Sequence, residues 1–146
     1  MIRFLVIACG NPLRADDGVG WHIADALQNA NTDPKIQIKA VQQLTPDLAE
    51  DISRADTVVF VDAIESERPG RVTIELLAET PDNQALFTHS VHPSSLLWLA
   101  RTLYEHTPQR AFLLTVTCSC FEYSEELSHP VALAVPEAVR RIQSIA

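Results

Sequence analysis

The chain has 146 residues, of which 47% are hydrophobic, so it can bury the core of one domain over residues 1–146 and is not a disordered chain. Its formal net charge is −8 at pH 7 and lysine occurs only at positions 35 and 39, which argues against a nucleic-acid partner because such partners need a basic surface. No apolar stretch reaches the roughly 18 residues of a membrane span and the N-terminus has no signal-peptide pattern, so we expect a cytoplasmic protein that does not bind membranes. We also expect a monomer.

The first part of the chain alternates strands with helices. The apolar run 2–8 predicts a strand, and residues 17–29 predict a helix because their apolar side chains recur at helical spacing. Residues 35–41 alternate polar with apolar side chains, which predicts a strand near a sheet edge. Thr45 and Pro46 then predict the N-cap and first residue of a short helix that ends near position 54.

The rest of the chain continues this alternation. The β-branched and aromatic run 57–62 predicts a central strand covered on both faces, whereas the alternating residues 71–76 predict an edge strand. A loop is expected over 79–88, a helix over 94–105 with Leu103 on its buried face, a strand over 110–118 and a closing helix over 136–146. Strands that alternate with helices predict a three-layer α/β/α sandwich with a mostly parallel sheet, flavodoxin-like in general plan.

Acidic residues follow two of the predicted strands. Asp16 and Asp17 lie in the glycine-rich segment 10–20, and Asp62 ends the most buried strand. In open α/β sheets, ligands bind beyond the carboxyl ends of the strands, and in a flavodoxin-like order these two strands are neighbours. We therefore expect Asp17 and Asp62 to converge. Like charges held close together repel unless a cation lies between them, so the pair indicates a metal site.

A histidine is the expected third ligand. His89 and His92 lie in segment 88–100, where Pro93 is expected at the first helical position. Each candidate also has a structural alternative, because an acidic residue favours a helix N-terminus and His92 could be an exposed or capping residue. The other histidines are expected in solvated positions: His22, His106 and His129.

Several other catalytic motifs are absent. Segment 10–20 matches neither the dinucleotide-binding nor the P-loop pattern, and no H-E-x-x-H or G-x-S-x-G motif occurs. Cys9, Cys118 and Cys120 form no C-x-x-C pair. Cys118 and Cys120 are expected on one face of a strand as small buried side chains, and a mid-strand Cys118 would be a poor nucleophile.

Four segments together resemble the [NiFe]-hydrogenase maturation proteases. GNPLRADDGVG (10–20) resembles their N-terminal motif, and VVFVDAIES (58–66) resembles their second motif. THSVHPSSLLWLA (88–100) resembles their histidine segment, and EYSEELSHPVALAVPEAVRRI (122–142) is similar to their C-terminal region. The resemblance covers nearly the whole chain.

This resemblance implies a five-stranded α/β endopeptidase of the cytoplasm. Such an enzyme removes a short C-terminal extension from the precursor of the hydrogenase large subunit once nickel has been inserted. The implied metal-binding and catalytic residues are Asp17, Asp62 and His92. Nickel would arrive with the substrate, and zinc or cadmium-like ions could replace it in isolation.

The family pattern also chooses between neighbouring candidates. It favours Asp17 over Asp16 as the last acidic residue before the glycine turn, and His92 over His89 because Leu96 follows four residues later. One segment departs from the pattern, since residues 42–46 read QQLTP where many members carry an Asp-Gly-Gly-Thr-type turn. This variant resembles members that serve bidirectional, NAD(P)-linked hydrogenases.

Two other functions remain open at this stage. The chain could be a non-catalytic chaperone or adaptor that binds the metal-loaded precursor without cutting it. It could also be an unrelated flavodoxin-like protein that binds a small molecule through Asn11 and the glycine turns.

Overall fold

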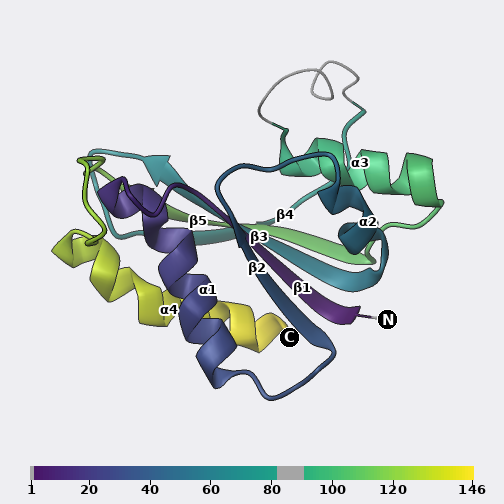
Figure 1. Cartoon of the computed structure of the whole chain (residues 1–146), viewed down its shortest axis with the longest axis horizontal. Helices are drawn as coiled ribbons and strands as arrows, with labels where there is room; N and C mark the ends of the chain where they lie inside the picture. Colours follow the sequence, from purple (N-terminus) through teal and green to yellow (C-terminus); the bar gives the residue numbers. More distant parts are fainter. Residues whose placement is uncertain (1, 82–90) are drawn as a thin grey trace.

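The computed structural model describes residues 2–81 and 91–146. Its centre is a five-stranded sheet in the order β2-β1-β3-β5-β4 (Figure 1). β1, β2, β3 and β5 run parallel, and the edge strand β4 is antiparallel to β5. The strands are β1 (Ile2–Cys9), β2 (Ile36–Val41), β3 (Ala55–Glu65), β4 (Val72–Leu76) and β5 (Arg110–Cys118). The mostly parallel sheet confirms the predicted fold class.

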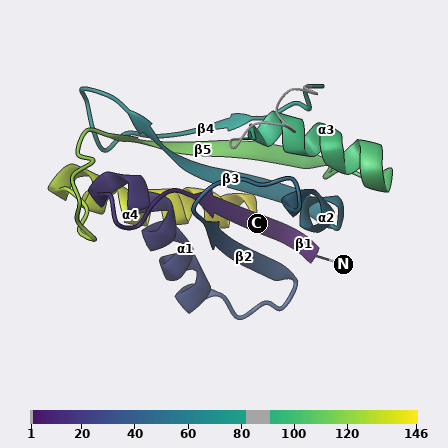
Figure 2. The ribbon, with the colours of Figure 1, turned by 45° about the horizontal axis from the view of Figure 1, so that its top comes forward.

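Helices cover both faces of the sheet, as Figure 2 shows. The chain forms a short 3-10 helix, η1 (Ala15–Gly18), and then α1 (Val19–Ala30), α2 (Leu48–Ser53), α3 (Pro93–Tyr104) and α4 (His129–Ile145). Helices α1 and α4 pack on one face, and α2 and α3 pack on the other. No helix in the described ranges is both long and apolar enough to cross a bilayer.

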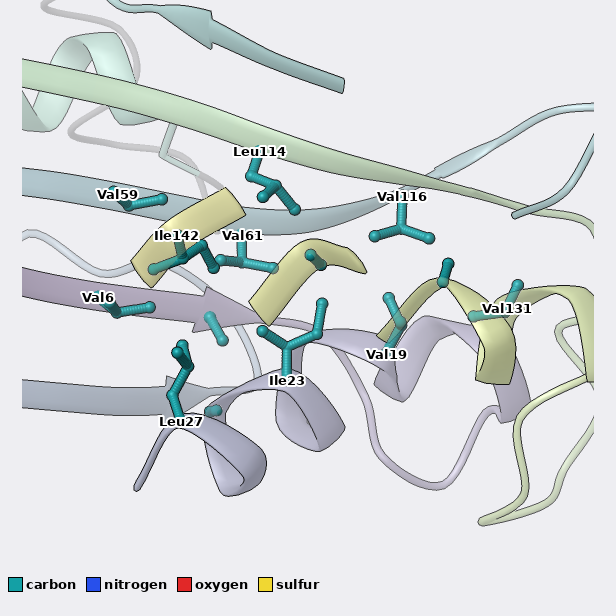
Figure 3. Close-up of a cluster of buried hydrophobic side chains, with 14 of the residues drawn as sticks. Val6, Val19, Ile23, Leu27, Val59, Val61, Leu114, Val116, Val131 and Ile142 are labelled. Carbon is teal, nitrogen blue, oxygen red and sulfur yellow. The ribbon is translucent and has the colours of Figure 1, made fainter. Parts of the chain in front are cut away.

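Two apolar cores lie on opposite faces of the sheet. Along β3, Val59 and Val61 point toward α1 and α4, whereas Val58 and Phe60 point toward α2 and α3, because successive strand residues face opposite sides. Figure 3 shows the first core, in which Ile23 of α1 points toward Val61 and Ile142 of α4 lies near Val59 and Val61. Burying each such side chain stabilises the fold by about 1.5–3 kcal/mol.

The central strand extends further than the apolar run predicted. β1 pairs with β3 only as far as Ala8 and Val61, whereas β5 pairs with β3 from Thr57 to Glu65. The prediction that Asp62 ends its strand is therefore wrong, because β5 continues to supply backbone partners after β1 has turned away. Asp62 is the first residue of β3 beyond its pairing with β1.

Two helix starts near the N-terminal half differ from the predictions. The predicted helix at 17–29 begins as η1 and becomes α-helical only at Val19. The short helix begins at Leu48 with Asp47 as its N-cap, so Thr45 and Pro46 do not have the predicted roles. Their carbonyl groups accept the N–H groups of the next turn, which places a turn before the helix.

The later helices show two further differences. α4 begins at His129, seven residues before the predicted start, and carries Pro136 inside it. A proline removes one helical hydrogen bond, but buried residues on both sides of Pro136, including Val131 and Ala138, keep the helix on the sheet. On α3, Leu103 is 60% exposed, so its predicted burial is wrong. Pro93 is the first residue of α3, as predicted.

Candidate functional site

The segment that follows β1 is folded tightly against the end of that strand. A Cβ on Gly10 would lie 2.0 Å from the backbone carbonyl oxygen of Asp17, and a Cβ on Gly18 would lie 2.9 Å from Cα of Pro12. These contacts leave no room for a side chain at either position. The glycines therefore bring the acidic turn back onto the carboxyl end of β1.

Asp17 is half-buried in this turn and points toward the strand end. Its Oδ2 accepts the backbone N–H of Asn11 at 2.8 Å, and its own N–H donates to the carbonyl of Arg14 at 3.0 Å. The first contact fixes the carboxylate, and the second closes the turn on which it is carried.

Asp62 comes from β3, next to the end of β1. The pKa of its carboxyl group is raised to about 6, mainly because the surrounding protein atoms displace water from the charged form, and additionally because Asp17 repels it. The N–H of Ala63, 2.8 Å from Oδ1, acts in the opposite direction. Although Asp62 keeps an open side toward solvent, this coupling shows that the structure brings Asp17 and Asp62 near one another.

A polar row continues from Asp62 across the sheet. Asp62 is in register with Thr115 of β5, which pairs with Thr73 of β4. The two threonine hydroxyls are 2.5 Å apart. Beyond this row lies Ile64, which is 50% exposed. Within the described residues no helix covers this part of the sheet face, and Figure 2 shows α3 over the opposite half of β3 and β5.

His92 lies on the same sheet face, where α3 begins. It is the N-cap residue, it is exposed, and its side chain makes no capping hydrogen bond. It lines a cavity of about 300 Å³ together with Leu113, and Leu113 precedes Thr115 by two residues, or about 7 Å of strand.

The described residues do not assemble a complete three-ligand site. Within 2–81 and 91–146, no group of three His, Cys, Asp or Glu side chains is arranged to hold a metal ion. Asp17 and Asp62 are brought together, whereas His92 is not joined to them in such a group. The alternative candidate, His89, lies outside the described residues.

Asp16 has surroundings unlike those of Asp17. It is 0% exposed, and its carboxylate accepts both the N–H and the hydroxyl of Ser128, at 2.7 and 2.8 Å. Cys120 donates a third, longer bond of 3.3 Å from its N–H. The sequence carries no signal for this role, because the donors lie more than a hundred residues away.

Cys9 and Cys118 offer no activated thiol. Burial, reinforced by the charge of Asp62, raises the pKa of Cys9 to about 11. Burial, with a further contribution from Asp16, raises the pKa of Cys118 to about 12. Both are neutral thiols near pH 7 and thus weak nucleophiles. Cys118 ends β5 and Cys120 lies beyond it, so the prediction that both lie within a strand is wrong.

An apolar cavity lies away from these acidic residues. It has a volume of about 360 Å³ and is lined by Phe4, Leu27, Ile36 and Ile142, near the amino ends of β1 and β2. Asp33 at its rim is already paired with Arg3 at 2.9 Å. The acidic pair lies elsewhere, next to the carboxyl end of β1, on the side of the sheet where open α/β folds bind their ligands.

Comparison with protein families gives a match over most of the chain. A family model described as "Hydrogenase maturation protease" matches residues 22–145. The acidic motif at 10–20 lies outside the matched residues.

Individual proteins show the same similarity. The hydrogenase 2 maturation protease of Escherichia coli (strain K12) is 32% identical over 98 residues, covering 65% of this chain and 58% of that protein. The matched stretch is thus less than two thirds of that relative's length.

Solved structures match over nearly the whole chain. The hydrogenase 2 maturation peptidase from Thaumarchaeota archaeon SCGC_AB-539-E09 has a TM-score of 0.74 and 27% identity, covering 98% of this chain and 97% of that one. The hydrogenase maturating endopeptidase HybD from E. coli has a TM-score of 0.78 at 24% identity, covering 99% and 91%. The similarity to HybD shows that the two proteins share a fold.

Proposed function

Because the chain belongs to the hydrogenase maturation protease family, we propose that it is an endopeptidase that removes the C-terminal extension of a nickel-loaded [NiFe]-hydrogenase large-subunit precursor. The observation that carries this proposal is that Asp17, which follows β1, and Asp62 of β3 lie near one another next to the carboxyl end of β1. Two adjacent carboxylates on an open sheet face provide an anionic site that a protein substrate can reach.

The proposed metal-binding and catalytic residues are Asp17, Asp62 and His92. The repulsion between the two carboxylates would be relieved by a cation between them, and carboxylates combined with an imidazole suit nickel, zinc or similar ions. Since no complete three-ligand group occurs among the described residues, we propose that nickel enters with the precursor and its own ligands. When bound, such an ion can polarise a carbonyl group or activate water.

The residues of this chain would then hold the ion and orient the substrate. Asp17 is held by the Asn11 N–H and would keep a fixed position toward the bound ion. Asp62, whose carboxylate lies near that of Asp17, would bind the same ion, and its raised pKa of about 6 belongs to the protein without a cation. Thr115 and Thr73 would offer hydroxyl groups to the peptide lying across the open face.

A non-catalytic adaptor that only binds the loaded precursor is the second candidate. Mass spectrometry of a nickel-loaded precursor, incubated with the purified protein, distinguishes the two. An endopeptidase shortens the precursor at its C-terminus, and an Asp62→Asn variant does not. An adaptor forms a complex in which the precursor keeps its full mass, and that result would contradict the proposed activity.

We also propose that the protein acts as a cytoplasmic monomer. The substrate surface on the open sheet face needs no second copy to complete the acidic pair, since Asp17 and Asp62 belong to the same chain. Sedimentation of the free protein tests this, and a stable dimer would contradict it.

A further inference from the structure

The buried carboxylate of Asp16 has no role in the function proposed above. A carboxylate taken out of water is costly unless donors replace the lost hydration, and Ser128 and Cys120 supply such donors. These contacts join the acidic turn to two distant places, the start of α4 and the segment that follows β5.

Backbone hydrogen bonds reinforce the same connection. Asp16 donates its N–H to Cys120 at 3.0 Å, and Ala15 donates its N–H to Ser124 at 2.7 Å. Ser124 in turn donates to the carbonyl of Leu13 at 2.9 Å. The acidic turn is therefore bonded along its length to the chain between β5 and α4.

This attachment holds a strained backbone. Ala15 has a φ of +46°, a conformation that a residue with a Cβ adopts only when its surroundings require it. Here the surroundings are the bonds of Ala15 and Asp16 to the segment around Ser124 and Ser128. Loss of those bonds would let the turn relax.

The strained turn determines where Asp17 points. Asp16 and Asp17 are consecutive residues of η1, and successive side chains of a 3-10 helix diverge by about 120°. The Asp16 carboxylate is held at the start of α4, and the Asp17 carboxylate, directed about a third of a turn away, accepts the N–H of Asn11. A change at Asp16 that rotates the turn would therefore also move Asp17.

We propose that Asp16 is a positioning residue that holds the Asp17 carboxylate toward Asp62 by anchoring the acidic turn to Ser128 and Cys120. It acts through Asp17 and does not touch the substrate. Its consequence for precursor processing rests on the proposed function, but its effect on the position of Asp17 does not.

The direct test is NMR spectroscopy of the full-length protein without metal or substrate. The Asn11 amide proton reports its hydrogen bond to Asp17, and Asp17→Asn gives the reference shift for an altered bond. In Asp16→Asn, an NH₂ group replaces one carboxylate oxygen, so the side chain can no longer accept all three hydrogen bonds. We therefore expect the Asn11 resonance to move at least half of the way to the shift seen in Asp17→Asn. Ser128→Ala, which keeps its backbone N–H, should move it less, in the same direction.

Val131→Ala is the matched control. Val131 is buried three residues after Ser128, so its truncation loosens α4 without removing an Asp16 contact, and the Asn11 resonance should stay in place. An unchanged Asn11 resonance in folded Asp16→Asn would overturn the proposal. If Asp16→Asn does not fold, an unchanged resonance in Ser128→Ala overturns it instead.

Processing provides a second readout. Processing is measured at a temperature where the Asp16→Asn and Val131→Ala proteins are both folded. Asp16→Asn should lower kcat/KM for the nickel-loaded precursor about 10- to 100-fold. Val131→Ala should keep a kcat/KM near that of wild type. Equal losses in the two variants would overturn the positioning role. If the wild-type protein cuts no precursor, the proposed function fails, whereas the NMR result still decides the role of Asp16.

Discussion

The carboxylate of Asp17 lies near enough to that of Asp62 to contribute to the rise of its pKa to about 6. Asp17 lies in the segment after β1, and Asp62 lies in β3. They meet because β3 continues beyond Val61, where its pairing with β1 ends. The fold therefore holds two carboxylates together although they repel each other.

Replacing Asp62 with asparagine should stabilise the metal-free protein near pH 7.5. Because the folded-state pKa of Asp62, about 6, is above its ordinary value of 3.8, the native state binds more protons between these values, and wild-type stability falls as pH rises through that window. Asp62→Asn has no titrating carboxyl group at this position, so its stability does not fall in this way. In chelator, its Tm should exceed that of wild type by about 2 °C at pH 7.5, with the difference vanishing below pH 4. A lower Tm at pH 7.5 would contradict this assignment.

Asp17→Asn, Asp62→Asn and His92→Ala should each abolish processing and leave the fold intact. The asparagine variants keep the shape of the side chain but lose the anionic ligand, and His92 is an exposed N-cap without a capping bond. Mass spectrometry of the precursor and circular dichroism of each variant provide the measurements. Asp47→Asn is the control, because Asp47 is an exposed N-cap whose side chain makes no capping bond. Near wild-type processing by Asp62→Asn would show that the ligand assignment is wrong.

Chelator treatment should leave the Tm of the isolated protein unchanged. No complete three-ligand site occurs in the described ranges, and two apolar cores hold the sheet. A resident ion bound tightly to the native state alone would instead raise the Tm by mass action. Thermal melts with and without chelator test this, and a clear decrease in Tm would point to a structural metal.

Nickel-free precursor should remain uncut even with the enzyme in excess. Without the cation, Asp17 and Asp62 repel each other and the substrate offers nothing to bridge them. The measurement is the mass of apo-precursor after incubation in chelator, with nickel-loaded precursor as the positive control. Efficient cleavage of the apo form would indicate a metal-independent protease.

Gly10→Ala should be far more damaging than Gly20→Ala. The added Cβ at Gly10 would lie 2.0 Å from a backbone oxygen of Asp17, whereas at Gly20 its nearest neighbour, the Ala8 Cβ, is 3.2 Å away. We expect Gly10→Ala to lose about 1–3 kcal/mol of unfolding free energy together with processing. At Gly20, which lies in α1, the better helix propensity of alanine, up to about 1 kcal/mol, offsets the tighter contact. Urea unfolding compares the two, and equal losses would contradict the tight turn.

Local patterns were sufficient for most strands and for the approximate place of the acidic pair. The apolar runs at 2–8, 57–62 and 110–118 predicted strands because burial on both faces leaves a continuous apolar signature. The rule that parallel strands end at one edge then placed Asp17 near Asp62. The strand predictions use the pattern of neighbouring residues. The prediction for Asp17 and Asp62 uses the order of strands and helices along the chain.

Only the tertiary structure decided how the acidic residues differ and where some elements end. Asp16 and Asp17 are chemically identical neighbours, but the first is buried by donors from Ser128 and Cys120, while the second is half-buried and accepts the N–H of Asn11. β3 continues past Asp62 because β5 continues beside it. Such outcomes depend on hydrogen bonds between residues far apart in the chain, and these partners leave no mark in the local pattern of either segment.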